Sequence, residues 1–222
     1  MITDYLIQLV LFFLILVTIS FLLKKIWSVI FTSQKFQLLV FPGVLLHEFS
    51  HMIGCFITGA KVDEVSFFSP KGSYVKHGKP KIPLLGSLII SFAPIAGGIS
   101  FLWLISGLFQ VKITSINTFE KIPLAMKELI STIINRGGDW SFWLFLYLVI
   151  STAICLSPSK KDIKNSAGAL VFVLALFFLL SQTEFVGDAF FSYLIGILAI
   201  GIFFGFLAFL VSLPIFFIRK LI

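Results

Sequence analysis

Long apolar runs constrain the fold of this chain more than any other feature. They recur six times, at residues 5–23, 36–57, 82–108, 140–156, 167–180 and 190–218. About 20 consecutive apolar residues are enough for a helix to cross the hydrocarbon core of a bilayer, and longer runs can cross with a tilt. The sequence therefore predicts an all-α integral membrane protein with about six transmembrane helices.

The composition excludes an ordinary soluble domain. Of the 222 residues, 59% are hydrophobic and 12% are charged, whereas soluble domains average roughly 45–50% apolar and about 25% charged residues. We therefore expect residues 1–222 to form a single polytopic membrane domain whose main surroundings are the lipid bilayer. Anionic lipid head groups explain the net charge of +7, so no nucleic-acid partner is needed.

The distribution of Lys and Arg predicts an orientation in the membrane. These residues favour cytoplasmic loops, and more of the 17 in this chain fall on the cytoplasmic side if the amino terminus is placed there. The first apolar run has an acidic front end and no small-residue cleavage site behind it, so we expect it to be retained as a span. The prediction is a multi-pass protein with both termini in the cytoplasm.

Two connections between the runs have patterns of their own. Residues 62–68 and 73–77 are rich in β-branched and aromatic side chains around a Ser-Pro-Lys-Gly turn signal, which predicts a small β-hairpin between the second and third spans. An irregular loop is the alternative. Residues 126–135 alternate between an apolar and a polar helical face, which is typical of a helix lying in the membrane interface.

The second apolar run contains the most informative residues, His47-Glu48-Phe49-Ser50-His51. This is an HExxH motif in a chain with only 3 His. At 3.6 residues per turn, residues i and i+4 lie one above the other on a helix, so both imidazoles can reach one Zn²⁺ at ~2.0–2.1 Å. Glu48 is turned by about 100° from His47, which suits a general base rather than a ligand. A metal-free hydrogen-bonded cluster joining helices is the alternative.

A catalytic zinc site usually takes three protein ligands, so one further ligand is needed. Asp162 is the first candidate, because it directly follows the fourth apolar run, where a helix end could fold back toward the metal. Ser159 and Asp162 also form a capping-box pattern, and the two roles are compatible. Glu184 could serve as the distant glutamate of other HExxH enzymes, and His77 in a polar loop is a weaker candidate.

The motifs resemble those of one known family, the site-2 protease family of intramembrane metalloproteases. The HExxH run with its hairpin-like segment is the first likeness. The second is similar to the family's Gly-Pro-x-x-Asn motif and has the sequence Phe92-Ala93-Pro94-Ile95-Ala96-Gly97-Gly98. The third looks like the family's Asn-Pro motif with its downstream Asp-Gly and has the sequence Ser157-Pro158-Ser159-Lys160-Lys161-Asp162. The likeness covers a catalytic core at approximately 36–165 and is that of a divergent member.

The resemblance implies an intramembrane zinc metalloprotease that hydrolyses peptide bonds of membrane-spanning protein or peptide substrates. It implies His47, His51 and Asp162 as zinc ligands and Glu48 as the catalytic residue that accepts a proton from the attacking water. The hairpin edge could hold an unwound substrate strand by β-augmentation. Two alternatives remain open at this point: a six-span HExxH protease that uses Glu184 as its third ligand, and a zinc-binding membrane protein without proteolytic activity.

Overall fold

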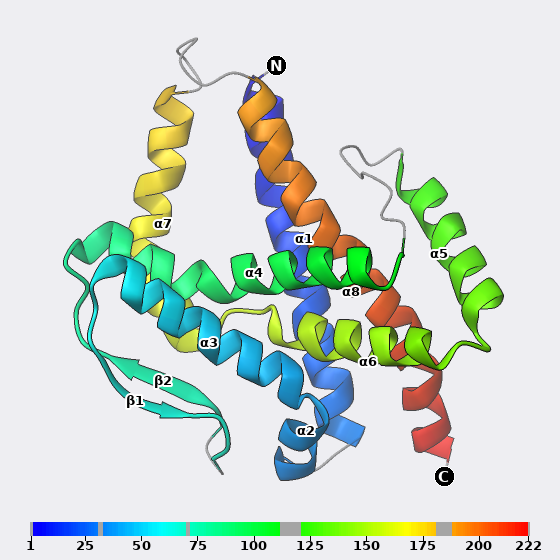
Figure 1. Ribbon diagram of the computed structural model, residues 1–222. Helices are drawn as coiled ribbons and strands as arrows, with labels where there is room; N and C mark the ends of the chain where they lie inside the picture. The colour runs from blue at the N-terminus through cyan, green and yellow to red at the C-terminus, as the bar shows by residue number, and fades with distance from the viewer. Residues whose placement is uncertain (1, 31–32, 70–71, 112–120, 181–187, 222) are drawn as a thin grey trace.

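The computed structural model describes all residues except 1, 31–32, 70–71, 112–120, 181–187 and 222. The described part is predominantly helical, with one small sheet (Figure 1). In chain order its elements are α1 (Ile2–Ile30), α2 (Ser33–Leu39), α3 (Phe41–Thr58), β1 (Val62–Ser66), β2 (Tyr74–His77), α4 (Pro83–Leu108), α5 (Ile122–Arg136), α6 (Trp140–Cys155), α7 (Lys160–Leu180) and α8 (Asp188–Leu221).

Three of the described helices are long and apolar enough to cross a membrane. They are Asp4–Val29, Pro83–Leu108 and Phe190–Ile218, and two shorter apolar helices cover Trp140–Cys155 and Gly168–Leu179. The predicted membrane character is thus supported, but the predicted count of six spans is not confirmed.

The predicted second span is not one continuous helix. The chain leaves helical geometry between α2 and α3, where Val40 is the residue before α3 and Pro42 lies in the first turn. Proline suits that position, because its missing N–H would have no partner at a helix start and its fixed φ favours the helix. The HExxH motif therefore lies on a separate helix of 18 residues.

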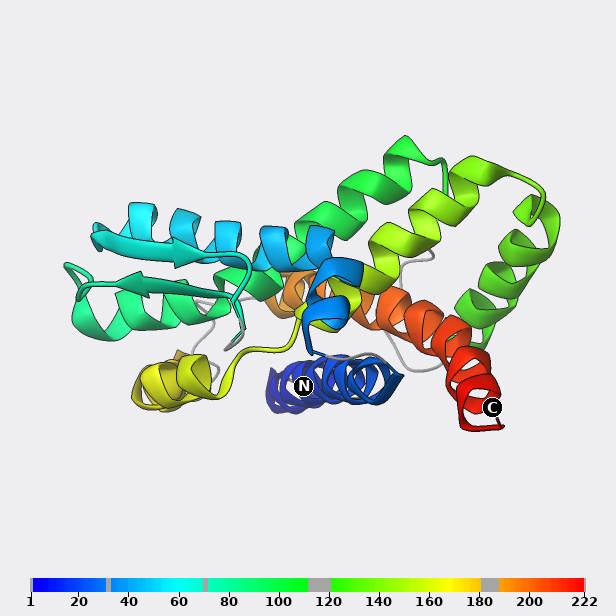
Figure 2. The same cartoon turned by 90° about the horizontal axis from the view of Figure 1, so that it is seen from below.

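The helices form two groups that run in different directions. In Figure 2, α1 and α7 are seen nearly end-on, whereas α3, α4 and α6 lie across the view. Helix α1 packs along α8, and Trp27 Nε1 of α1 donates a hydrogen bond of 2.8 Å to Ser212 Oγ of α8. Helices α1, α3, α4, α6 and α8 share one hydrophobic core, whose buried side chains include Phe12, Leu16, Val44, Ile99, Phe145 and Phe204.

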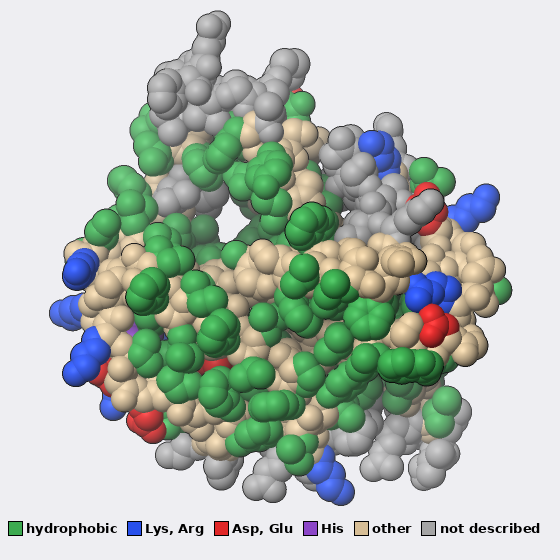
Figure 3. Space-filling model, in the orientation of Figure 1, with side chains coloured by type: hydrophobic (Ala, Val, Ile, Leu, Met, Phe, Trp, Pro, Cys, Tyr) green, Lys and Arg blue, Asp and Glu red, His purple; other side chains and the backbone are tan. Residues whose placement is uncertain are grey.

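Apolar side chains also cover much of the outer surface. The face in Figure 3 is largely hydrophobic over α3, α4 and α6, and the charged side chains lie toward its margins. Phe56 of α3 is 87% exposed and Trp103 of α4 is 62% exposed. Continuous apolar surface of this kind is unusual for a protein surrounded by water and suits contact with lipid.

Helices α3 and α6 approach each other closely at the start of α3. A Cβ atom at Gly43 would collide with the backbone carbonyl of Ser151, so only glycine fits there. The Ser151 hydroxyl donates to Val40 O at 3.0 Å and accepts from Gly43 N–H at 2.8 Å. One α6 side chain thereby satisfies backbone groups at the α3 start and fixes the HExxH helix against α6.

The predicted hairpin is confirmed, with antiparallel pairing of β1 and β2 and a bulge between Val62 and Glu64. Beyond the strand ends, Gln37 Nε2 donates to Ser69 O at 3.0 Å, and the Phe41 and Phe68 rings stack with centroids 4.9 Å apart. These contacts tie the hairpin to α2 and α3. Two residues of the predicted turn, 70–71, lie outside the described residues.

The chain ends lie at opposite ends of the α1–α8 pair, because both helices run from the upper to the lower part of Figure 1. The prediction that both termini lie in the cytoplasm is therefore not supported.

If α1 and α8 both cross the bilayer, an epitope tag at the amino end and one at the carboxyl end should be digested from opposite sides of sealed vesicles. Digestion of both tags from one side would contradict this packing and favour the orientation predicted from Lys and Arg.

Candidate metal centre

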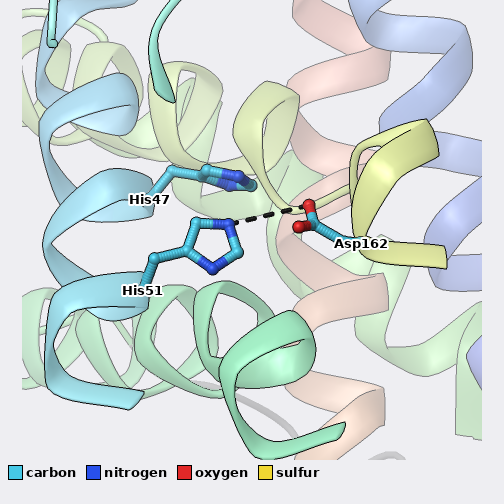
Figure 4. A group of neighbouring side chains, drawn as sticks. All are labelled: His47, His51 and Asp162. Atoms are coloured by element: carbon cyan, nitrogen blue, oxygen red, sulfur yellow. Dashed lines mark ion pairs between the residues drawn. The ribbon is translucent and has the colours of Figure 1, made fainter. Parts of the chain in front are cut away.

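Helix α3 presents both histidines of the HExxH motif to the same side. The ring centroids of His47 and His51 are 4.9 Å apart, and the ring planes are inclined by 81°. In Figure 4 both rings extend from α3 toward Asp162 at the start of α7. The spacing of four residues thus brings the two imidazoles together as the sequence predicts.

Each imidazole is oriented by a backbone carbonyl from a different helix. His47 Nδ1 lies 2.7 Å from Cys155 O, and His51 Nδ1 lies 2.8 Å from Ile90 O. A carbonyl oxygen can only accept, so each Nδ1–H is the donor, and each ring when neutral has its lone pair on Nε2. This is the tautomer of a histidine that binds a metal through Nε2 while a neighbouring acceptor holds the ring in place.

Both carbonyls can accept these bonds because the helices around them leave them free. The Ile90 carbonyl would normally bond to the N–H of residue 94, but Pro94 lies inside α4 and has no N–H. Cys155 is the last residue of α6, where carbonyl groups have no partner further along the helix. Pro94, in the segment that resembles the Gly-Pro-x-x-Asn motif, thus frees the carbonyl that orients His51. The sequence pattern did not predict this role.

Asp162 completes a group that could hold a metal ion. Its Oδ2 lies 3.6 Å from His51 Nε2, and the potential ligand atoms of His47, His51 and Asp162 all lie within 4.8 Å of one another (Figure 4). Two ligand atoms on a tetrahedral zinc at 2.0–2.1 Å would be roughly 3.3 Å apart. The His51–Asp162 pair is already close to that separation.

Asp162 is also the capping residue that its sequence context predicts. Ser159 N–H donates to Asp162 Oδ2 at 2.8 Å, and Asp162 N–H donates to Ser159 Oγ at 3.1 Å, which is a reciprocal capping box at the start of α7. Burial by itself would raise the pKa of Asp162, but the hydrogen bond and positive charge of His51 in its protonated, metal-free form, together with the hydrogen bonds with Ser159, lower it to about 2. The side chain is therefore an ionised carboxylate at neutral pH, the form that binds a metal.

A serine of α1 holds the segment that connects α6 to α7. Ser20 Oγ donates to Ala153 O at 2.7 Å and accepts from Ser157 N–H at 2.8 Å. Ser20 therefore fixes the chain on both sides of Cys155, whose carbonyl orients His47. Sequence reasoning missed this residue, because a single Ser in an apolar run gives no signal of its distant partner.

Glu48 lies beside the histidines without joining the group of potential ligands among the described residues. It is only 3% exposed and accepts a hydrogen bond from the side chain of Ser73, which precedes β2. Glu48, both histidines and Asp162 line one open cavity of about 840 Å³, which residues of α1, α2, β2 and the segment after α6 also line. The carboxylate is thus available to chemistry at the metal centre while Ser73 holds it.

Of the other two candidate ligands, the structure describes only His77. His77 ends β2 and lines the cavity, but its Nδ1–H donates to Gly78 O at 2.8 Å and it is outside the potential ligand group of the described residues. Glu184 lies outside the described residues, so its role as a distant ligand stays a prediction.

Comparison with known proteins adds no family assignment. No family model, curated protein or solved structure matches this chain. The resemblance to the site-2 protease family therefore rests on the sequence motifs. The structure itself provides a His/His/Asp group that could hold a metal ion, with a buried glutamate beside it.

Proposed function

We propose that this protein is an intramembrane zinc metalloprotease that hydrolyses peptide bonds of membrane-embedded protein or peptide substrates. One observation carries the proposal. The potential ligand atoms of the two HExxH imidazoles and Asp162 lie within 4.8 Å of one another, and Glu48 lines the same cavity. A purely structural histidine cluster would not require two carbonyl-oriented rings, a third potential ligand and a separate buried acid.

The set of donor atoms suits zinc. Two imidazole nitrogens and one carboxylate oxygen are a common ligand set of catalytic zinc, which keeps its fourth position open. Calcium and magnesium instead prefer sites built from oxygen atoms alone. When bound, zinc polarises the scissile carbonyl and lowers the pKa of water toward ~7.

Glu48 is the general base of the proposed reaction. Its carboxylate accepts a proton from the attacking water and delivers it to the leaving nitrogen when the peptide bond breaks. Ser73 lies beside the Glu48 carboxylate as its side-chain partner in the same cavity. Burial in the cavity keeps bulk water from competing with the substrate, which strengthens each of these interactions.

The outer edge of β2 is positioned to hold the substrate backbone. Gly78 N–H donates across the hairpin to Lys61 O at 2.8 Å. Alternate residues of an antiparallel strand direct their backbone groups to the same edge, so Val75 and His77 face the edge away from β1. Both residues line the cavity, and no residue of Val62–Ser66 does. A substrate helix that unwinds can pair its freed N–H and C=O groups with this edge.

The proposal places this chemistry in a membrane-embedded chain. Three long apolar helices support that setting. The finer prediction of six spans requires α3, α6 and α7 to cross as well, and it stays a prediction. Substrates would reach the cavity as membrane-spanning proteins or peptides, because the surfaces around α3, α4 and α6 are apolar (Figure 3).

Metal content separates the two roles of Asp162. Purified protein should carry about one zinc per chain, and Asp162→Ala should lose most of it together with activity, because one of three protein ligands is removed. Ser159→Ala is the matched control: it removes the cap at a cost of about 0.5–2 kcal/mol but keeps the carboxylate, so zinc should remain. Elemental analysis at matched expression measures this, and full zinc occupancy in Asp162→Ala would exclude it as a ligand.

Glu48→Gln tests the base directly. The amide keeps the shape of the side chain but cannot accept the proton, so cleavage of a membrane peptide should fall by roughly 10²–10⁴-fold while zinc and fold are retained. Glu64→Gln is a suitable control, because Glu64 lies on β1 and does not itself line the cavity. Unchanged cleavage by the Glu48 variant would argue against the proposed reaction and for a zinc-binding protein without this activity.

Proline substitutions test the β2 edge. Val75→Pro removes an N–H that faces the open edge, so it should abolish most cleavage while zinc content is preserved. Val65 is the cross-strand partner of Val75, and its N–H faces the opposite edge of the hairpin, which does not line the cavity. Val65→Pro should therefore retain activity. Equal losses in both variants, with zinc retained, would mean that the hairpin matters as a whole rather than through its edge.

A further inference from the structure

Three lysines line the cavity that contains the candidate metal centre. Lys24 and Lys25 belong to α1, and Lys161 belongs to α7. Within the described residues, none of the three forms an ion pair with a carboxylate. The acidic residues that line the cavity are Glu48 and Asp162, and the proposed function already uses both. The cavity thus contains more positive than negative charge, even before a zinc ion adds two more positive charges.

Lys24 lines the cavity next to a fixed contact between helices. It lies one helical turn after Ser20, whose hydroxyl bonds on both sides of Cys155 and so fixes this part of α1 against the end of α6. The Lys24 side chain is exposed, so its charge lies at the accessible part of the cavity that His47 and Glu48 also line. Its position therefore depends on a defined contact between helices.

Lys161 supplies positive charge from a second helix. It precedes Asp162 in the first turn of α7, where the capping box with Ser159 fixes the backbone. Lys24 and Lys161 thus lie on separate elements that enclose the same cavity. A group that enters the cavity meets cationic side chains from α1 and from α7.

Uncompensated positive charge around a concave site attracts anions and raises their local concentration there. A substrate that brings a carboxylate gains from this field, whereas one that brings a cation is repelled. We infer that the cavity selects peptide substrates that carry an aspartate or glutamate within a few residues of the scissile bond. This inference rests on the proposed function, which it extends by naming the substrate class.

The experiment compares two membrane peptides that differ only in one Glu or Gln near the cleavage site. The zinc-loaded protein is reconstituted in phosphatidylcholine vesicles, so that no net anionic lipid competes. We expect the Glu peptide to have a kcat/KM about three- to tenfold higher than the Gln peptide. Lys24→Gln and Lys161→Gln should each reduce this ratio toward one. Lys164→Gln is the matched control, because Lys164 lies on α7 but does not line the cavity, and the ratio should stay unchanged.

Binding measurements separate failure of this inference from failure of the proposed function. Fluorescently labelled forms of both peptides are titrated against the wild-type protein and against the same lysine variants. Tighter binding of the Glu peptide without any cleavage would support the inference and overturn the protease proposal. Cleavage of both peptides at equal rates and with equal affinities would overturn the inference alone.

Anionic lipid is the other source of negative charge, and a second arm of the experiment tests it. At low phosphatidylglycerol content, the preference for the Glu peptide should remain. At higher content, the lipid should weaken the preference by screening the lysines or by competing for them. If the peptides show no preference and phosphatidylglycerol inhibits the wild type but not Lys24→Gln, the cavity binds lipid head groups. That result would overturn the inference.

Discussion

Two hydrogen bonds from imidazole rings to backbone carbonyls determine the geometry on which the candidate site depends. A histidine ring on a helix can rotate, and either of its nitrogens can carry the proton. The neutral rings of His47 and His51 are each restricted to one tautomer by the carbonyls of Cys155 and Ile90. Neither carbonyl has a hydrogen-bond partner within the helix to which it belongs. Pro94 releases the Ile90 carbonyl and the end of α6 releases that of Cys155. Carbonyls left free by irregular helical hydrogen bonding thus orient the two rings of the candidate metal centre.

The same structure shows how helices are held together when lipid provides no hydrophobic drive for their association. Small residues and serine hydroxyls lie where helices meet, because close approach and hydrogen bonds stabilise packing in an apolar surrounding. Gly43 permits contact between α3 and α6, and Ser151 and Ser20 join backbones of different helices. These contacts lie within a few residues of the metal-centre groups, so helix packing and site geometry are set by the same interactions.

Sequence patterns predicted the features that depend on local geometry. The spacing of four residues placed the two imidazoles on one face of α3, and the β-branched pattern predicted both strands of the hairpin. The capping pattern at Ser159 and Asp162 was also correct. The length of an apolar run was a less reliable guide to helix boundaries. The run at 36–57 is divided between two helices, because hydropathy carries no information on the helix start that Pro42 favours.

By itself, the sequence determined that the chain is apolar and helical, that one helix carries an HExxH face, and that a hairpin follows it. Only the tertiary structure brought Asp162 to the histidines, supplied carbonyls from α4 and α6, and placed Ser20 of α1 against the end of α6. It also set α3, α4 and α6 across α1 and α7 (Figure 2). The physical reason is that periodicity, capping and turn chemistry act within a few residues, whereas a metal centre requires atoms from distant segments to meet within a few ångströms. That meeting depends on how the helices pack, which no local pattern encodes.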